Sequence, residues 1–253
     1  MRESATASSR PPQRTEPQRA NRGRFSTMRL PPGLLMIVAV MSAPLAASPL
    51  SGQARIDEGT FVFLKGGAPA RTETFKISRN RNVITATAQV SAGTQQIAFS
   101  LATDTLGTPT QYKMSIRDRG AGVTELRAMA QGGRLTSMTS SQTGDESMRE
   151  YPLTAGKTLL LEPGLLHLLY FVPLGKSPGT FQLIEPRSAR TLNGTLSAKG
   201  PESIQVAGTA VAGTHYTLAV GPGRYEFWVD NKGRLLRVES ADGLSATRED
   251  LPR

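Results

Sequence analysis

The feature that most constrains the fold is a series of short stretches, from Arg55 onward, in which apolar and polar residues alternate. In the first of them, Phe61 and Phe63 precede a Gly-Gly pair, and Phe75 and Ile77 follow it. Successive side chains of a strand face opposite sides of a sheet, so this pattern predicts a β-hairpin. Similar stretches recur at spacings of roughly 8–15 residues, which is typical of antiparallel sheets rather than βαβ units.

Three further turn signals support this interpretation. Gly132-Gly133 and Asn193-Gly194 each separate two alternating stretches, and Asn-Gly flanked by apolar residues is a strong signal for a tight hairpin turn. The sequence Asp230–Gly233 fits a type I turn followed by a left-handed glycine. We therefore expect a mainly β protein: a single curved antiparallel sheet, or half-barrel, of roughly 12 strands.

One segment, LEPGLLHLLYFVPLG at residues 161–175, breaks the alternation. Between Gly164 and Val172 its one polar side chain is His167. Its leucines favour a helix, although Tyr170 and Phe171 also suit a strand. About nine helical residues span only some 14 Å, which is too short to cross a membrane. The residues of one helical stripe are Leu165, Leu168, Leu169 and Val172.

A helix that is apolar on more than one stripe must be covered on both sides. We therefore expect one short helix in the concave face of the sheet. Two interpretations stay open: the helix fills the concavity as core, or it leaves space there for an apolar ligand. His167 is expected to be a core or rim histidine rather than a ligand-binding residue.

The first 54 residues have a different character. Residues 1–27 are rich in Arg, Ser and Pro and are expected to be a disordered basic leader, or to precede the true start at Met28. Residues 28–54 contain a basic start, an apolar run and small residues before Arg55, which together predict a Sec-type signal peptide. We expect export to the periplasm or beyond the cell of a bacterium, with an uncleaved membrane anchor as the alternative. Residues 55–253 are then a single β-rich domain.

Charge and cysteine content exclude several classes of protein. Seven of the 30 Lys and Arg residues and two of the 20 acidic residues lie in residues 1–54, so the remainder carries 23 basic and 18 acidic residues, a net charge of +5. This mild excess permits weak contact with anionic envelope surfaces but predicts no nucleic-acid binding. The chain has no cysteine, which excludes disulfides, thiolate catalysis, cysteine-bound metal and a lipidated N-terminal Cys.

No motif predicts catalysis or a cofactor. The sequence GKSPG around Ser177 matches the nucleophile pattern G-x-S-x-G, but a predicted strand follows it where a helix is required. Pro178 also lacks the backbone N–H that an oxyanion hole needs at that position. His167 and His215 lie far apart, without a metal-binding motif. We expect a protein that is not an enzyme and has no metal and no cofactor.

The signal peptide, the long meander from GTFVFLKGGAPARTETFKISR, the apolar segment and the closing YEFWVDNKGRLLRVES together resemble the exported LolA/LolB half-barrel superfamily and its uncharacterised relatives. The resemblance covers roughly residues 58–240. It implies a curved sheet that encloses a hydrophobic cavity for acyl chains. The lipid-anchoring cysteine of a LolB-type receptor is absent, and the resemblance assigns no individual ligand residue.

We therefore expect an exported, non-catalytic and monomeric protein that binds a lipid or another hydrophobic molecule in its cavity. The alternative is a structural or interaction module of the cell envelope with a filled core. The amount of space beside residues 163–172 distinguishes the two. The candidate cavity residues are Leu165, Leu166, Leu169, Tyr170, Phe171 and Trp228.

Overall fold

The computed structural model describes residues 53–141, 143–174 and 177–252. The predicted leader and nearly all of the predicted signal peptide lie outside the described residues. The elements in chain order are β1 (Ala54–Lys65), β2 (Ala68–Asn80), β3 (Val83–Ala92), β4 (Gln95–Thr103), β5 (Pro109–Asp118), β6 (Gly122–Gln131), β7 (Arg134–Ser140), β8 (Glu146–Pro152), β9 (Thr158–Leu160), the 3-10 helix η1 (Leu166–Phe171), β10 (Gly179–Glu185), β11 (Arg190–Val206), β12 (Thr209–Val220), β13 (Gly223–Val229), β14 (Leu235–Ser240) and β15 (Leu244–Arg248).

All the strands belong to one sheet, in the order β8-β7-β6-β5-β4-β3-β2-β1-β15-β14-β13-β12-β11-β10-β9. The pairs are antiparallel except β9 with β10, which is parallel. The first and last strands meet in the middle of the sheet, where Phe61 of β1 is opposite Arg248 of β15. The mainly β class and the curved sheet predicted from the sequence are confirmed.

The two edge strands show how strongly the sheet curves. β8 and β9 lie at opposite edges of the sheet, yet they follow each other in the chain across residues 153–157. A linker of this length reaches at most about 20 Å. The sheet must therefore curl until its edges approach each other. The N–H of Gly156, beside β9, donates to Thr108 Oγ1 at 2.8 Å, which ties that edge to the start of β5.

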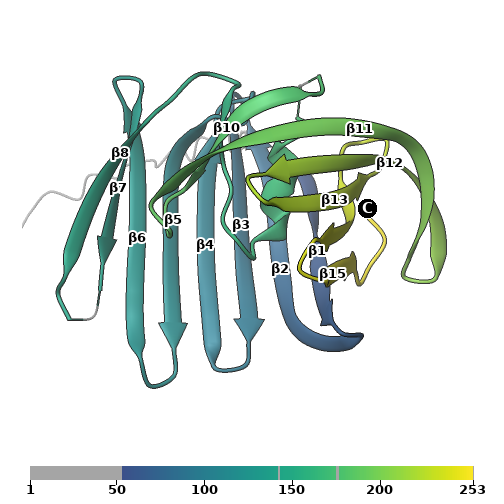
Figure 1. The fold of residues 1–253 in the computed structure, drawn as a ribbon, viewed down its shortest axis with the longest axis horizontal. Helices are drawn as coiled ribbons and strands as arrows, with labels where there is room; N and C mark the ends of the chain where they lie inside the picture. Colours follow the sequence, from purple (N-terminus) through teal and green to yellow (C-terminus); the bar gives the residue numbers. More distant parts are fainter. Residues whose placement is uncertain (1–52, 142, 175–176, 253) are drawn as a thin grey trace, which may run out of the picture. The chain divides into compact units, whose positions relative to one another are not determined.

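Figure 1 shows the resulting arrangement. Strands β2 to β8 lie side by side as a broad wall, and β10 to β13 cross in front of part of it. Along most strands, apolar side chains are buried at every second position, as in β3, where Ile84, Ala86, Ala88 and Val90 are buried. These inward side chains and those of η1 form one hydrophobic core.

The apolar segment forms a 3-10 helix of six residues, not the longer helix with α-helical spacing that the sequence suggested. A helix this short gains little from α-helical cooperativity, and single tight turns are commonly 3-10. Gly164, with φ +88°, reverses the chain immediately before it. η1 contacts both β3 and β14, and all six of its residues are buried. In the described part of the chain, no helix has the length and apolar character needed to cross a membrane.

The prediction of roughly 12 strands is too low, because the described residues form a sheet of 15 strands. Two strands carry no alternating pattern in the sequence. The three residues of β9 are all buried, so this strand merges with the apolar segment that follows it. β15 lies in the polar C-terminal stretch, and it is a strand because it pairs with β1 and β14.

The predicted hairpin turn at Asn193-Gly194 is wrong. β11 continues through both residues, and Gly194 pairs with Phe181 on one side and Val220 on the other. A Cβ on Gly194 would lie 2.8 Å from Leu183 Cδ1, so this glycine provides room for the neighbouring strand. The chain turns instead after Val206, at the end of β11. The turns at Gly66-Gly67, Gly132-Gly133 and Asp230–Gly233 lie where the sequence placed them.

The far ends of β11 and β12 form a second, smaller cluster. Ile204 and Val206 of β11 pack with Trp228 and Leu236, and the half-buried Val211 joins them. Trp228 alternates with Phe227 and Val229 along β13, and both of these belong to the main core. The smaller cluster therefore covers the outer face of the sheet.

Candidate ligand-binding cleft

A cleft of about 730 Å³ lies beside the apolar segment. Pro163, Gly164 and Leu166 form one side of it, and residues of β2, β4 and β10–β15 form the rest. Its volume is in the range of sites that hold small ligands, roughly 300–1,000 Å³. The cleft touches the apolar segment at its first residues, while the remainder of the segment packs in the core.

The lining of the cleft combines apolar and charged side chains. The apolar contributors are Ile97, Pro163, Leu166, Leu192, Val220, Pro222, Tyr225 and Leu244. The charged contributors are Arg71, Glu162, Glu185, Arg187, Arg190, Arg224 and Asp242. Four of the seven are arginines and three carry carboxyl groups, so the lining has an apolar part and a charged part of mixed sign.

Arg71 is the most unusual of these arginines. It is opposite Phe63 in the β1–β2 ladder, and its guanidinium carbon lies 3.9 Å from the centre of the Phe63 ring. A Cβ on Gly164 would lie 2.6 Å from Arg71 Nη1, so the missing side chain at Gly164 leaves space for the guanidinium. Burial lowers the pKa of Arg71. Its Nε is buried without a hydrogen-bond partner, and within the described residues the guanidinium makes no ion pair.

Glu162 is the second unusual group, because it is a carboxyl group that is only 2% exposed. Its Oε1 accepts hydrogen bonds from the backbone N–H of Arg187 at 2.9 Å and from the Tyr112 hydroxyl at 3.2 Å. Its Oε2 is buried and has no partner among the described residues. Burial raises the pKa of Glu162 to about 7, against the two hydrogen bonds that lower it. Burial, followed by the nearby Glu162 carboxyl, raises the pKa of Tyr112.

Two other arginines of the cleft are paired. Arg190 Nη2 lies 2.8 Å from Glu185 Oε2, and Arg224 Nε lies 2.9 Å from Glu226 Oε1. In the described part of the chain, the guanidinium of Arg187 has no carboxylate within ion-pair distance. Arg71 and Arg187 are therefore the arginines of the cleft without an ion pair among the described residues, although Glu73 and Asp242 act electrostatically on Arg71, and Glu162 interacts electrostatically with Arg187.

The sequence-predicted cavity residues occupy three different environments. Leu166 lines the cleft. Leu165, Leu169, Tyr170 and Phe171 are each no more than 6% exposed and belong to the main core. Trp228 packs in the smaller cluster on the outer face of the sheet, and its indole N–H donates to Glu202 at 2.9 Å.

His167 lies in the core, where its side chain is 0% exposed. Its Nδ1 is 2.6 Å from Oε1 of Glu73 on β2, and its Nε2 has no partner among the described residues. The same carboxylate also accepts from the backbone N–H groups of Leu166, at 2.9 Å, and His167, at 2.8 Å. Glu73 thus caps the start of η1 from a distant strand.

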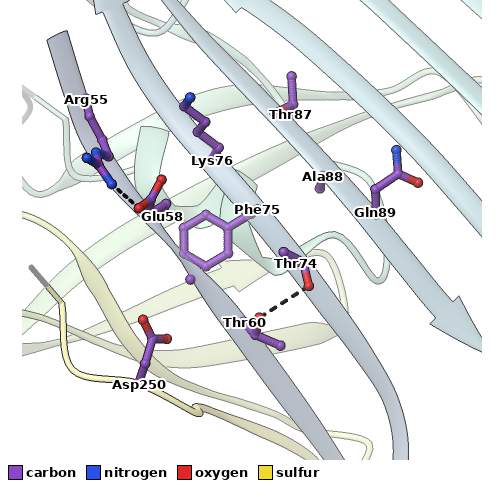
Figure 2. A pocket seen from close by; sticks show the side chains of 11 residues that line it. Arg55, Glu58, Thr60, Thr74, Phe75, Lys76, Thr87, Ala88, Gln89 and Asp250 are labelled. Carbon is purple, nitrogen blue, oxygen red and sulfur yellow. Dashed lines mark hydrogen bonds and ion pairs between the residues drawn. The ribbon is translucent and has the colours of Figure 1, made fainter.

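A second cavity, of about 770 Å³, lies over β1–β3 (Figure 2). Its lining is mostly polar, with Thr60 and Thr74 hydrogen-bonded to each other across the β1–β2 ladder. Arg55 pairs with Glu58 at its rim. Phe75 is the one large apolar side chain in the lining, so this cavity offers little surface to an apolar ligand.

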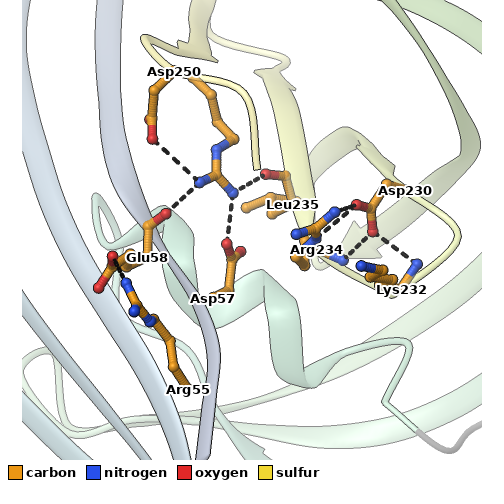
Figure 3. Close-up of polar contacts among 9 residues, drawn as sticks. Arg55, Asp57, Glu58, Asp230, Lys232, Arg234, Leu235 and Asp250 are labelled. Carbon is orange, nitrogen blue, oxygen red and sulfur yellow. Dashed lines mark hydrogen bonds and ion pairs between the residues drawn. The ribbon is translucent and has the colours of Figure 1, made fainter. Parts of the chain in front are cut away.

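A buried polar network lies beside this cavity (Figure 3). The Arg248 guanidinium donates to Asp57 Oδ1 at 2.8 Å and to the backbone carbonyl oxygens of Leu235 and Glu58. Its side chain is 0% exposed and that of Asp57 is 2% exposed. Burial raises the pKa of Asp57 even though Arg248 lowers it. This network joins β15 to β1 and is a structural contact.

Other candidate chemistry is not brought together. Of the GKSPG motif, Gly175 and Lys176 lie outside the described residues. Ser177 lies two residues before β10, so the element that follows it is a strand and not a helix. Among the described residues, no group of three or more His, Asp or Glu side chains could hold a metal ion.

Residues 90–248, more than half of the chain, match the family model described as Domain of unknown function (DUF6134). The chain belongs to this family. No curated protein matches this DUF6134 chain.

Solved structures are similar to this chain, and the first of those described here shares its barrel-like fold. One is the crystal structure of a β-barrel-like protein, a domain of unknown function DUF1849, from Brucella abortus, with a TM-score of 0.50, 10% identity, and coverage of 78% of this chain and 97% of that one. Another is a DUF1089 family protein from Pseudomonas aeruginosa, with a TM-score of 0.37, 12% identity, and coverage of 65% and 87%. The matching family is DUF6134 and not LolA or LolB, so a barrel-like fold is the part of the predicted resemblance that is supported.

The sequence interpretation missed Arg71, Glu73, Glu162 and Arg187. A signal for the first two was present, because Arg71 and Glu73 occupy the same face of β2 as the predicted core residues Phe75 and Ile77. A charged residue on the apolar face of a strand needs a partner or a ligand. Glu162 and Arg187 carry no such pattern, since they meet only after the chain has folded.

Proposed function

We propose that this protein is an exported, non-catalytic binding protein that holds a lipid or another hydrophobic molecule in the cleft. The observation that carries the proposal is the space of about 730 Å³ beside Pro163, Gly164 and Leu166. Burial of eight methylene groups of an acyl chain would contribute about 6 kcal/mol. Micromolar binding requires about 8 kcal/mol in addition to the costs of association, so polar contacts to the lining must supply the rest. Export rests on the signal peptide predicted at residues 28–54.

The test uses the neutral dye N-phenyl-1-naphthylamine, whose fluorescence rises in an apolar site. We expect the purified native protein to bind the dye saturably, and a long-chain alcohol to displace it. Leu192→Trp places a large ring in the cleft and is expected to weaken dye binding at least tenfold. Val83→Trp adds the same ring at a residue that is 43% exposed and outside the cleft, and it should have no effect.

Both variants should be checked by circular dichroism and thermal melting, so that a loss of binding is not a loss of fold. Native mass spectrometry adds a second readout, the mass of any co-purified lipid. If the native protein takes up no dye before it unfolds and carries no lipid, the proposal is refuted.

The second candidate is a structural or interaction module of the cell envelope. It is favoured by the complete burial of the core side of the apolar segment, where Leu168 and Leu169 are 0% exposed and Phe171 is 1% exposed. This candidate predicts that Leu168→Ala costs about 2–5 kcal/mol of stability through the cavity it leaves. It also predicts that the native protein binds neither dye nor lipid, and this result separates it from the first candidate.

A further inference from the structure

We propose that the cleft binds an amphiphile with an anionic headgroup, that Arg71 and Arg187 hold the headgroup, and that the carboxyl group of Glu162 controls binding through its own charge. The inference rests on the proposed binding function and narrows it to a class of ligand. The headgroup is a carboxylate, phosphate or sulfonate type of anion. The tail lies on the apolar lining formed by Leu166, Leu192 and Val220.

Arg71 carries a positive charge that is only partly exposed to water. A guanidinium stays charged in proteins, and a charge removed from water is costly unless it is paired. Arg71 is half-buried, with its Nε enclosed and unpartnered. Contact with the Phe63 ring offsets part of this cost. An anion in the cleft would supply the missing partner, and Arg187 lies in the same lining.

Gly164 determines the space around the Arg71 guanidinium. Gly164 adopts a φ of +88°, and a side chain there would require the guanidinium to shift from its position. Gly164 also lies between Pro163 and the start of η1, on the apolar side of the cleft. The chain therefore brings the cation and the apolar wall together at one position. A cation beside an apolar wall fits an amphiphile better than a fully polar anion.

Glu162 lies in the same lining as the two arginines. An ionised carboxylate there would repel an incoming anion and compete for Arg187. A neutral carboxyl group would not, and burial favours the neutral form. The charged and titratable groups that surround Glu162 are Tyr112 from β5, Glu185 from β10, Arg187 from the turn after β10, and Arg71 from β2. The Tyr112 hydroxyl and the Arg187 backbone N–H both donate to Oε1 of Glu162. In the neutral form of Glu162, the proton is therefore on Oε2.

The consequence is a pH dependence of affinity. Burial raises the pKa of Glu162 to about 7, so the neutral fraction falls from about nine-tenths at pH 6 to about one-tenth at pH 8. The apparent affinity for a ligand scales with the fraction of protein in the competent state. If the neutral form binds the anion, affinity should fall about tenfold between these two pH values.

The experiment uses two dyes with the same aromatic skeleton. N-phenyl-1-naphthylamine is neutral, and 1-anilinonaphthalene-8-sulfonate carries a sulfonate whose charge does not change between pH 6 and pH 8. We expect the sulfonate dye to bind more tightly than the neutral dye at pH 6 and to weaken about tenfold by pH 8. The neutral dye should bind equally at both values.

The variants separate the roles of the residues. Arg71→Met should lower affinity for the sulfonate dye at least fivefold and leave the neutral dye unchanged, while Arg117→Met removes an exposed arginine elsewhere and should alter neither. Glu162→Gln should bind the sulfonate dye at pH 8 as well as at pH 6. Glu146→Gln, at an exposed glutamate, should keep the pH dependence of the wild type.

The outcomes are distinct. If neither dye binds, the proposed function itself fails. If the neutral dye binds but the sulfonate dye binds no better, or its affinity changes less than twofold with pH, the headgroup inference is overturned while binding stands. If inorganic phosphate displaces the sulfonate dye as well as decanesulfonate does, the site binds small anions without a tail, and the amphiphile is ruled out. If Arg71→Met does not fold, Arg71→Lys is measured in its place to test the headgroup contact. If Glu162→Gln does not fold, the pH profile of the wild type tests the role of Glu162.

Discussion

The most informative change to the core is Glu73→Leu, because one carboxylate organises the start of η1. Glu73 is 0% exposed and accepts hydrogen bonds from the backbone N–H groups of Leu166 and His167 and from His167 Nδ1. Leucine preserves much of the volume but accepts none of the three bonds. Each buried donor left unsatisfied costs about 1–3 kcal/mol. We therefore expect Glu73→Leu to lower the free energy of unfolding by about 4 kcal/mol or more.

Urea denaturation followed by circular dichroism measures this difference. His167→Leu should show a smaller loss, because the two backbone N–H groups keep their acceptor. The double variant should lose less than the sum of the two single variants, since the Glu73–His167 contact is counted in both. Glu150→Leu, at an exposed glutamate of β8, is the matched control and should change stability by less than about 0.5 kcal/mol. A loss below 1 kcal/mol for Glu73→Leu would refute the capping role.

Three further predictions concern other buried groups. Arg248→Met leaves Asp57 buried without its partner, so we expect a loss of about 3–5 kcal/mol in urea denaturation and faster amide hydrogen exchange in β15. The pKa of Glu162 is about 7 in the folded chain and 4.5 ordinarily, so the folded state holds the proton more tightly. The free energy of unfolding should therefore fall by about 3 kcal/mol as pH rises from about 4.5 to about 7. Glu162→Gln should remove this pH dependence. Trp228→Ala should cost about 3–5 kcal/mol because it empties the smaller cluster, yet leave dye binding unchanged because Trp228 lies outside the cleft.

The sheet was predictable where side chains alternate and turns have clear signals. The β1–β2 and β13–β14 hairpins lie where the sequence placed them, because each combines alternation with a glycine turn. β9 and β15 were not predictable, since they become strands through pairing with partners that are distant in the sequence. The turn predicted at Asn193-Gly194 is wrong because the close approach of β10, and not the local turn preference, determines the backbone conformation there.

The candidate site was predictable only in part. The apolar segment identified the region, and Leu166 lines the cleft as the sequence suggested. Periodicity could not tell which leucines face the core and which face the cleft, because the segment is apolar on both sides. Arg71 lies on β2, near the middle of the sheet, and Glu162 lies shortly after the edge strand β9, so only the curvature of the sheet places them in one cleft.

The central position of the β1–β15 pair has a consequence for how the chain folds. Asp57 and Arg248, which join these two strands, are 191 residues apart. During synthesis, β1 to β8 can pair in order as they emerge, but the free side of β1 has no partner until the last strand arrives. Contacts of this sequence separation are slow to form, and an unpaired inner strand invites association with other chains. Truncation that removes β15 should therefore leave β1 unpaired on one side and produce a chain that aggregates.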